Sequence, residues 1–354
     1  MTTDADLQRS IAAIRRRRFD EAVSLLKQVL ARQPNHLQAH WLMVQSLESQ
    51  GQADEAIEQL RLLLIHARKD LAAIDQIAGH MRQRQYPLDH VLRSYAKFLE
   101  HQPDSAIAAF NYAYNLSKAA RFEAAIQMYE RALALGISEP EEVHLNIANI
   151  YMDHLHAQEA AKAHLQKALT LNPSYSSAFY NLGNLAEQEG ERDEARRNFE
   201  QCLQLDPTNE SALARLADTQ KFTQQDDSLL ASLVKTARNS SNSDLHFATG
   251  KAYEQLREYD KAWSHFSRGN ELDRRAMPAY NAKKTEAVFK RLASSCDRAW
   301  LGQFTGSSRD LVFICGMFRS GSTLLEQMLA SHPGFVAGGE SEFFPRLVAR
   351  EFPD

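Results

Sequence analysis

The sequence is poor in the features that mark several common classes of protein. Only three of its 354 residues are cysteines, Cys202, Cys296 and Cys315, and none forms a CxxC pair. We therefore expect free thiols in a reducing cytoplasm rather than a disulfide framework. No HExxH motif occurs, and we expect no bound metal. The net charge of −4 gives no sign of nucleic-acid binding, and no stretch is apolar enough to cross a membrane. Neither a nucleic acid nor a membrane is an expected partner.

Glycine and proline are also few, at 14 and 10 residues, which together with 44% hydrophobic residues favours a mainly α-helical protein. The length of the chain predicts two domains. What the sequence does contain is internal repetition with a period near 34 residues: Ala161 and Ala195 are 34 apart, and so are Pro173 and Pro207. This is the length of a helix-turn-helix unit that stacks on further units of the same kind.

The clearest unit runs from Ser176 to Pro207. In it, Gly183 and Ala195 are small residues where two helices would touch, and Phe199 would fill the groove between the helices. A later unit repeats this pattern with Gly250, Tyr253, Ala262 and Phe266, and degenerate units run from Leu71 to Pro103 and from Asn209 to Asn242. These spacings resemble the tetratricopeptide repeat family. The resemblance implies about eight units over residues 1–278, forming an α-solenoid whose concave groove binds a protein or peptide partner.

Asparagine recurs at one position of three successive units, at Asn111, Asn146 and Asn181, each 35 residues from the next. This resembles the asparagine ladder in the repeat domain of O-linked N-acetylglucosamine transferase. There, side-chain amides bind the main chain of a substrate peptide. An amide both donates and accepts hydrogen bonds, so these residues are candidates for peptide binding. The alternative is that asparagine simply tolerates an exposed helix face.

The segment from Leu311 to Pro333 has a different character. An apolar run is followed by G-x-x-x-x-G-S-T and an amphipathic pattern, which predicts a strand at 311–315, an anion-binding loop and a helix at 323–329. Ser322 stands where a nucleotide hydrolase has lysine, which argues against an ATPase. The candidate anion ligands are Gly316, Arg319, Ser320, Gly321, Ser322 and Thr323. The alternative is a strand-to-helix turn with a Ser/Thr N-cap and no ligand.

GMFRSGSTLLEQMLASHP followed by GGESEFF resembles the 5′-phosphosulfate-binding loop of sulfotransferases, most closely the tyrosylprotein sulfotransferase branch and its bacterial relatives that bear tetratricopeptide repeats. The resemblance implies transfer of a sulfuryl group from 3′-phosphoadenosine 5′-phosphosulfate to a hydroxyl, with a tyrosine of a recruited protein or peptide as the expected acceptor. It assigns Arg319 to charge stabilisation and Glu340 to the general base, with Glu342 as the competing candidate. Phe318 replaces the usual proline, which weakens the expected order of the loop.

The expected architecture is mainly α: a tetratricopeptide-repeat α-solenoid over residues 1–278, a capping helix and linker over 279–308, and the first strand, loop and helix of a P-loop-like α/β sulfotransferase domain over 309–354. Members of that family complete the nucleotide site far beyond the loop, whereas 35 residues follow Arg319 here. We therefore expect a C-terminally truncated chain that transfers no sulfate at a useful rate. The alternative function is a non-catalytic repeat scaffold that binds peptide or protein partners.

Overall fold

The computed structural model describes residues 3–223, 228–277, 282–295 and 322–335, and all regular structure within them is α-helical. Residues 3–277 hold eight helix pairs, each with a first helix, the A helix, and a second, the B helix. The A helices are α1 (Thr3–Arg15), α3 (Leu37–Ser49), α5 (Leu71–Gln83), α7 (Ala106–Lys118), α9 (Pro140–Asp153), α11 (Ser176–Glu189), α13 (Glu210–Asp218) and α15 (Ser243–Gln255). The B helices are α2 (Phe19–Arg32), α4 (Ala53–His66), α6 (Asp89–His101), α8 (Phe122–Ala134), α10 (Gln158–Leu171), α12 (Arg192–Leu205), α14 (Ser228–Ala237) and α16 (Tyr259–Ala276).

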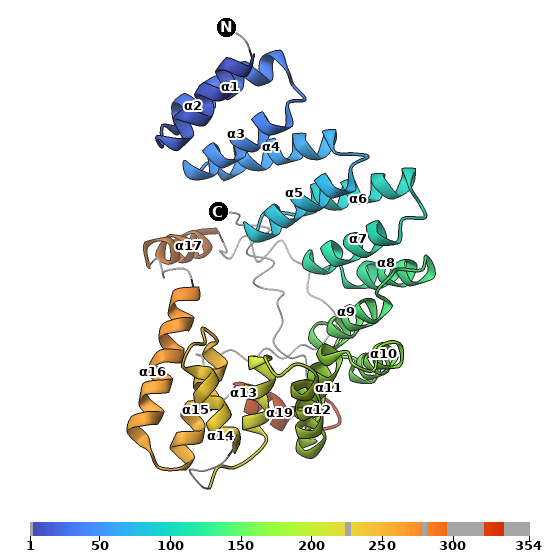
Figure 1. Cartoon of the computed structure of the whole chain (residues 1–354), viewed down its shortest axis with the longest axis vertical. Helices are drawn as coiled ribbons and strands as arrows, with labels where there is room; N and C mark the ends of the chain where they lie inside the picture. Colours follow the sequence, from blue (N-terminus) through green and yellow to red (C-terminus); the bar gives the residue numbers. More distant parts are fainter. Residues whose placement is uncertain (1–2, 224–227, 278–281, 296–321, 336–354) are drawn as a thin grey trace. The chain divides into compact units, whose positions relative to one another are not determined.

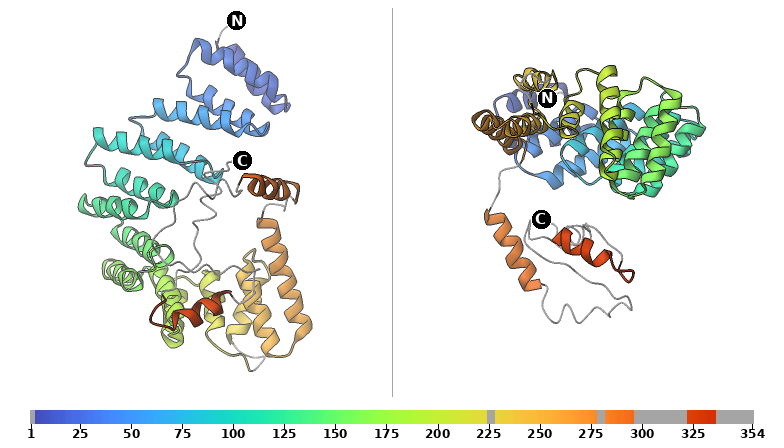
Figure 2. Two further views of the ribbon diagram at one scale, coloured as in Figure 1. Left: turned by 180° about the vertical axis from the view of Figure 1, so that it is seen from behind. Right: turned by 90° about the horizontal axis from the view of Figure 1, so that it is seen from below.

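The pairs stack on one another in chain order (Figure 1). From α5 to α10, the A helices lie on one side of the stack and the B helices on the other, and the same order is seen from behind in Figure 2. This confirms the predicted tetratricopeptide-type α-solenoid.

Two further helices follow, α17 (Ala282–Ser295) and α19 (Ser322–Ala330). The second agrees with the helix predicted at 323–329. The predicted strand at 311–315 lies outside the described residues. The proposed division of the chain at residues 278 and 308 stays a prediction.

A column of alanines explains the period of the sequence. One alanine in each of six B helices points into its unit, and all are buried: Ala22, Ala56, Ala125, Ala161 and Ala195 are 0% exposed and Ala262 is 3% exposed. A methyl group is small enough to let the two helix backbones of a pair approach closely, and the column therefore recurs at the repeat spacing in six of the eight units.

Two glycines fit directly against aromatic rings. A Cβ added to Gly183 would lie 2.5 Å from Phe199 Cε1, and one added to Gly250 would lie 2.5 Å from Phe266 Cε1. Phe199 is 0% exposed, so its ring has no free space to retreat into. The structure confirms the predicted contact between a small A-helix residue and a B-helix aromatic.

The degenerate unit is shorter than the others. Its helices α13 and α14 contain 9 and 10 residues. The asparagines that mark its ends in the sequence are N-caps: the Asn209 side chain accepts from the amide of Ala212 at 2.9 Å, and Asn242 caps α15 through the amide of Asp244 at 2.9 Å. These caps satisfy amides that would otherwise lack partners at the start of each A helix.

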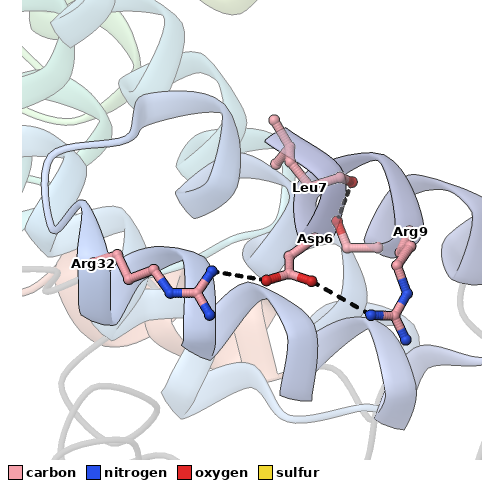
Figure 3. A network of polar contacts seen from close by, with 5 residues as sticks. Asp6, Leu7, Arg9 and Arg32 are labelled. Atoms are coloured by element: carbon pink, nitrogen blue, oxygen red, sulfur yellow. Dashed lines mark hydrogen bonds and ion pairs between the residues drawn. The ribbon is translucent and has the colours of Figure 1, made fainter. Parts of the chain in front are cut away.

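The N-terminal pair is held by a buried carboxylate (Figure 3). Asp6 of α1 is 1% exposed and accepts from Arg32 of α2 at 2.8 Å and from Arg9 of its own helix at 3.4 Å. Because an isolated buried charge is costly, the two guanidinium groups make this position tolerable, and the Arg32 contact ties α1 to α2.

The apolar core is divided along the stack. One cluster extends from Leu7 to Ile150, and a second from Ala148 to Leu185. A small third cluster centres on Phe199, and a fourth runs from Leu213 to Ala252 around the short unit. Each cluster is built from neighbouring units, as expected for a repeat protein in which units contact only their neighbours.

We predict that Gly183→Ala destabilises the protein by about 1–3 kcal/mol, because the new methyl group overlaps the buried ring of Phe199. Gly79→Ala is the matched control, since the nearest atom to its added Cβ is Arg82 Nη2 at 3.8 Å; it should be neutral or stabilise α5 by up to about 1 kcal/mol. Denaturant melts followed by circular dichroism measure both. Equal effects of the two substitutions would contradict the proposed packing.

Candidate functional site

A row of polar side chains links the A helices of successive units, and we call it the polar row. Its contacts join residues about one repeat length apart, so the repeat itself brings the partners together. They are Glu48–His80 at 2.8 Å, Asp75–Asn111 at 2.8 Å, Arg82–Asn115 at 2.6 Å, Asn149–Asn181 at 2.6 Å, Glu187–Arg215 at 3.5 Å and Asp218–Lys251 at 2.9 Å. Between α3 and α15, these contacts join every two neighbouring A helices except α7 and α9. Among the described residues, no such contact links α7 to α9, so the polar row is interrupted there.

Asn111, the first of the three predicted ladder asparagines, is engaged within the chain. Its Nδ2 donates to Asp75 Oδ2 at 2.8 Å, and the Tyr95 hydroxyl donates to the other oxygen of the same carboxylate. Burial raises the pKa of Asp75, although both hydrogen bonds act in the opposite direction. The Asn111 donor is therefore used by the fold, while its Oδ1 makes no hydrogen bond with the described residues.

The other two ladder asparagines differ from Asn111. Asn181 donates through Nδ2 to Asn149 Oδ1 at 2.6 Å, whereas Asn146 is half-buried and makes no hydrogen bond with the described residues. Asn184 Oδ1 is buried without a partner in the described part of the chain. The structure thus places unused amide groups on α9 and α11, and peptide binding by Asn111, Asn146 and Asn181 stays a prediction.

Two cations share one aromatic ring beside Asn111. The guanidinium carbon of Arg82 lies 5.0 Å from the centroid of the Tyr114 ring, and Lys118 Nζ lies 5.2 Å from the same centroid. Both distances suit a cation–π contact. Arg82 is held further by its hydrogen bond to Asn115, whose side chain is buried.

A pocket of about 320 Å³ lies between α3, α4 and α5. Its wall is mainly apolar, with Leu37, Trp41, Leu63 and Ile77, and its polar members are His66, Asp70 and Gln76. Trp41 is fixed by edge contact with His80 at 5.4 Å between ring centroids. A pocket of this size and lining can accept an apolar side chain from a partner.

The predicted anion loop lies mostly outside the described residues. This applies to Gly316, Arg319, Ser320, Gly321 and Glu340. The backbone of α19 begins at Ser322, so the described helix starts at the last residues of the G-x-x-x-x-G-S-T motif. The side chains of Ser322 and Thr323 lie outside the described part of the chain, and their assignment as anion ligands stays a prediction.

Histidines form two close pairs that the sequence did not reveal. His144 Nδ1 lies 3.0 Å from His164 Nδ1, and three units later His246 Nδ1 lies 3.2 Å from His265 Nδ1. In each pair one nitrogen must donate and the other accept, so at most one of the two rings can carry a proton on both nitrogens. Burial, with the neighbouring His144 and Lys167, lowers the pKa of His164 to about 4.

The described residues contain no group of three or more histidine, cysteine or acidic side chains arranged to hold a metal ion. Cys202 is buried and free, and burial beside Asp206 raises the pKa of its thiol to about 11, so it is a poor nucleophile at neutral pH. None of the helices in the described part combines the length and apolar character needed to cross a bilayer.

Sequence reasoning missed Asp75, Arg82, Tyr114 and Lys118, although the asparagine at 111 was identified. The signal that could have identified them lies in pairs of residues. A polar residue on one A helix has its partner on the next A helix, about one repeat length later in the sequence. Aligning the polar positions of neighbouring A helices would have found Asp75 with Asn111 and Arg82 with Asn115.

Comparison with known families agrees with this organisation. Tetratricopeptide repeat models match residues 13–79, 113–176 and 176–209. A sulfotransferase family model matches residues 311–353. The chain therefore contains tetratricopeptide repeats, and a short C-terminal region is similar to the sulfotransferase family.

Two curated relatives match the chain over more than half of its length. An uncharacterized protein of Aquifex aeolicus is 25% identical over 216 residues, covering 58% of this chain and 28% of the relative. Tetratricopeptide repeat protein 6 of Homo sapiens is 26% identical over 204 residues, covering 57% of this chain and 38% of the relative. The matched region thus spans well under half of each relative.

The chain is similar to two solved structures. One is the APC/C hetero-tetramer Cut9–Hcn1, and the other is YrrB. The first has a TM-score of 0.47 and 16% identity, covering 72% of this chain and 50% of that chain. The second, described as a tetratricopeptide repeat protein with an unusual peptide-binding site, has a TM-score of 0.36 and 20% identity, covering 60% and 95% of the two chains.

We predict that acidification destabilises the fold through the histidine pairs. The folded-state pKa of His164, about 4, is below the reference value of 6.5, so the unfolded chain takes up the proton first as the pH falls. The contribution of His164 to stability is complete above pH 6.5 and is lost progressively towards pH 4. Thermal midpoints measured between pH 7.5 and 4.5 should fall accordingly.

His164→Gln should reduce this pH dependence, because glutamine keeps a hydrogen-bonding group without titrating. A glutamine already occupies the position equivalent to His164 in the second unit. It is Gln59, and its Oε1 lies 2.8 Å from His40 Nδ1. His101→Gln, which removes a histidine at an exposed position outside the pairs, is the control. If the two variants respond to pH alike, the assignment to the buried pair is wrong.

Proposed function

We propose that this chain is part of a sulfotransferase, with 3′-phosphoadenosine 5′-phosphosulfate as donor and with repeats that recruit a protein or peptide acceptor. The observation that carries the proposal is the sulfotransferase match over residues 311–353. The start of α19 at Ser322 supports it, because an anion site of this kind needs a helix that begins at the end of the loop.

Donor binding would use the backbone more than any single side chain. The N–H groups from Arg319 to Thr323 would converge on the 5′-phosphosulfate ahead of α19, and the helix N-terminus contributes up to about 2 kcal/mol to binding an anion. The hydroxyls of Ser320, Ser322 and Thr323 and the Arg319 guanidinium would add charge-assisted hydrogen bonds. Gly316 and Gly321 would leave room for the backbone to turn towards the anion.

The proposed reaction is an in-line displacement at sulfur. The acceptor oxygen forms a bond to sulfur while the bond between sulfur and the bridging phosphate oxygen breaks, and 3′-phosphoadenosine 5′-phosphate leaves with the electron pair. The acceptor proton passes to Glu340, or to Glu342 as the alternative base. Arg319 and the loop amides stabilise the negative charge that develops on the transferred and leaving oxygens. Tyrosine is the acceptor that the resemblance to the tyrosylprotein branch favours.

A second candidate is a non-catalytic scaffold that binds partners through its repeats. The specific observation in its favour is that the three repeat models cover far more of the chain than the sulfotransferase match does. Both candidate functions use the repeats to bind a partner. They differ in whether the predicted anion loop binds the sulfate donor. In both, we propose a cytoplasmic protein, consistent with the buried free thiol of Cys202.

Calorimetric titration of the chain with 3′-phosphoadenosine 5′-phosphate tests the sulfotransferase proposal. We expect binding that Arg319→Ala weakens about 10- to 100-fold, since a hydrogen bond to a charged group contributes about 1.5–3 kcal/mol. Arg197→Ala, which removes an exposed arginine of α12, should not change the affinity. Absence of binding to the unaltered chain, or equal losses in both variants, would favour the scaffold.

A further inference from the structure

The interruption of the polar row lies next to unpaired cations. Elsewhere in the row, charged side chains of neighbouring A helices neutralise one another, as Glu187 and Arg215 do at 3.5 Å and Asp218 and Lys251 do at 2.9 Å. Between α7 and α9 no such pair forms among the described residues. Lys118 is exposed, and neither it nor Arg82 makes an ion pair with a described residue.

The two cations are held near one point. Each lies within 5.2 Å of the centroid of the Tyr114 ring, so their charges are at most about 10 Å apart. This is close to the Debye length of about 8 Å at physiological salt, so one anion beside the ring would feel both. The buried amide of Asn115 fixes the Arg82 guanidinium through a 2.6 Å hydrogen bond, whereas the Lys118 ammonium can turn towards a ligand.

The charges around this point favour a small anion. Asp75 is the acidic group that acts on Arg82, and its carboxylate is already engaged by Tyr95 and Asn111. The single charge of this carboxylate can offset at most one of the two positive charges. The acidic members of the polar row on either side are already paired, Glu48 of α3 with Arg84 at 2.9 Å and Glu187 of α11 with Arg215 at 3.5 Å.

We propose that Arg82, Lys118 and Tyr114 form a binding site for one anionic side chain of a peptide held by the repeats. The proposal rests on recruitment of a peptide acceptor, as in the proposed function, and adds its chemical class: a segment with a carboxylate or a sulfate ester. The cations bind the anion by charge-assisted hydrogen bonds. The adjacent Asn111 Oδ1 and the unpaired amide of Asn146 are available to the peptide main chain.

The test uses the full chain and three fluorescein-labelled peptides built from serine and alanine around one tyrosine. The first has three glutamates beside the tyrosine, the second has glutamines in their place, and the third is the glutamine peptide with a sulfated tyrosine. Fluorescence anisotropy should show that the glutamate peptide binds about tenfold more tightly than the glutamine peptide at low salt, with a smaller difference at high salt. Tight binding of the third peptide would show that a sulfate ester also serves as the anion.

Variants identify the site. Lys118→Gln should lower the affinity for the glutamate peptide about three- to tenfold and leave the glutamine peptide unchanged, since only the anion contact is lost. Lys251→Gln is the matched control, because its ammonium is already paired with Asp218. Arg82→Lys keeps the charge and should retain most of the preference for glutamate. Thermal melts establish that each variant is folded.

The possible outcomes separate this inference from the function on which it rests. Equal binding of the glutamate and glutamine peptides, or equal losses in Lys118→Gln and Lys251→Gln, would overturn the anion site while peptide recruitment stands. Failure of all three peptides to bind would overturn both. Donor binding, measured separately with 3′-phosphoadenosine 5′-phosphate, depends on Arg319 and is unaffected by any of these results.

Discussion

The close approach of the two helices within each unit is the constraint on which the rest of the structure depends. A helix pair can bury its apolar stripe only if the backbones come near enough for one side to fill the gaps of the other. The chain achieves this with a fully buried alanine in most B helices and, in two units, with a glycine that receives an aromatic ring. The spacing near 34 residues in the sequence is the consequence of meeting this requirement once per unit.

Because the apolar contacts hold the pairs and their neighbours together, the polar side chains of the A helices can serve a second purpose. Most of them bind one another across units, as Asp75 does with Asn111, and these contacts fix how one unit is rotated on the next. A partner can use only what the fold leaves unpaired. The region from α7 to α11 is therefore the most informative part of the repeats, since Lys118, Asn146 and the oxygen of Asn184 lack such partners in the described residues.

The fold was predictable where a short pattern determines it. Small and aromatic residues at fixed spacing identified the unit from Ser176 to Pro207, and α11 begins at Ser176. Asn209 and Asn242 marked the short unit because a capping side chain acts on amides two or three residues away. The helix after the anion loop was also predicted, since α19 begins one residue before its expected start.

Much of the candidate site was not predictable, because its geometry depends on residues that are distant in the sequence. Nothing near Asn111 indicates that Asp75 accepts from its amide, and nothing near His144 indicates that His164 lies 3.0 Å away. The first contact follows from the rotation of one unit on the next, and the second from the packing of α9 on α10 within one unit. Both arise from the sum of many side-chain volumes. Aligning equivalent positions of the repeats can suggest which residues are partners. The distances between the partners and their protonation states can be obtained only from the folded structure.

The division of the apolar core into clusters has a mechanical consequence. The cluster that ends at Ile150 and the one that begins at Leu213 share no buried residue, and the units between them are held by smaller groups of contacts. A tension applied to the two ends of the repeats would be carried by these clusters in series. The chain would then lengthen in separate steps, with the smallest cluster, around Phe199, giving way before the large N-terminal one.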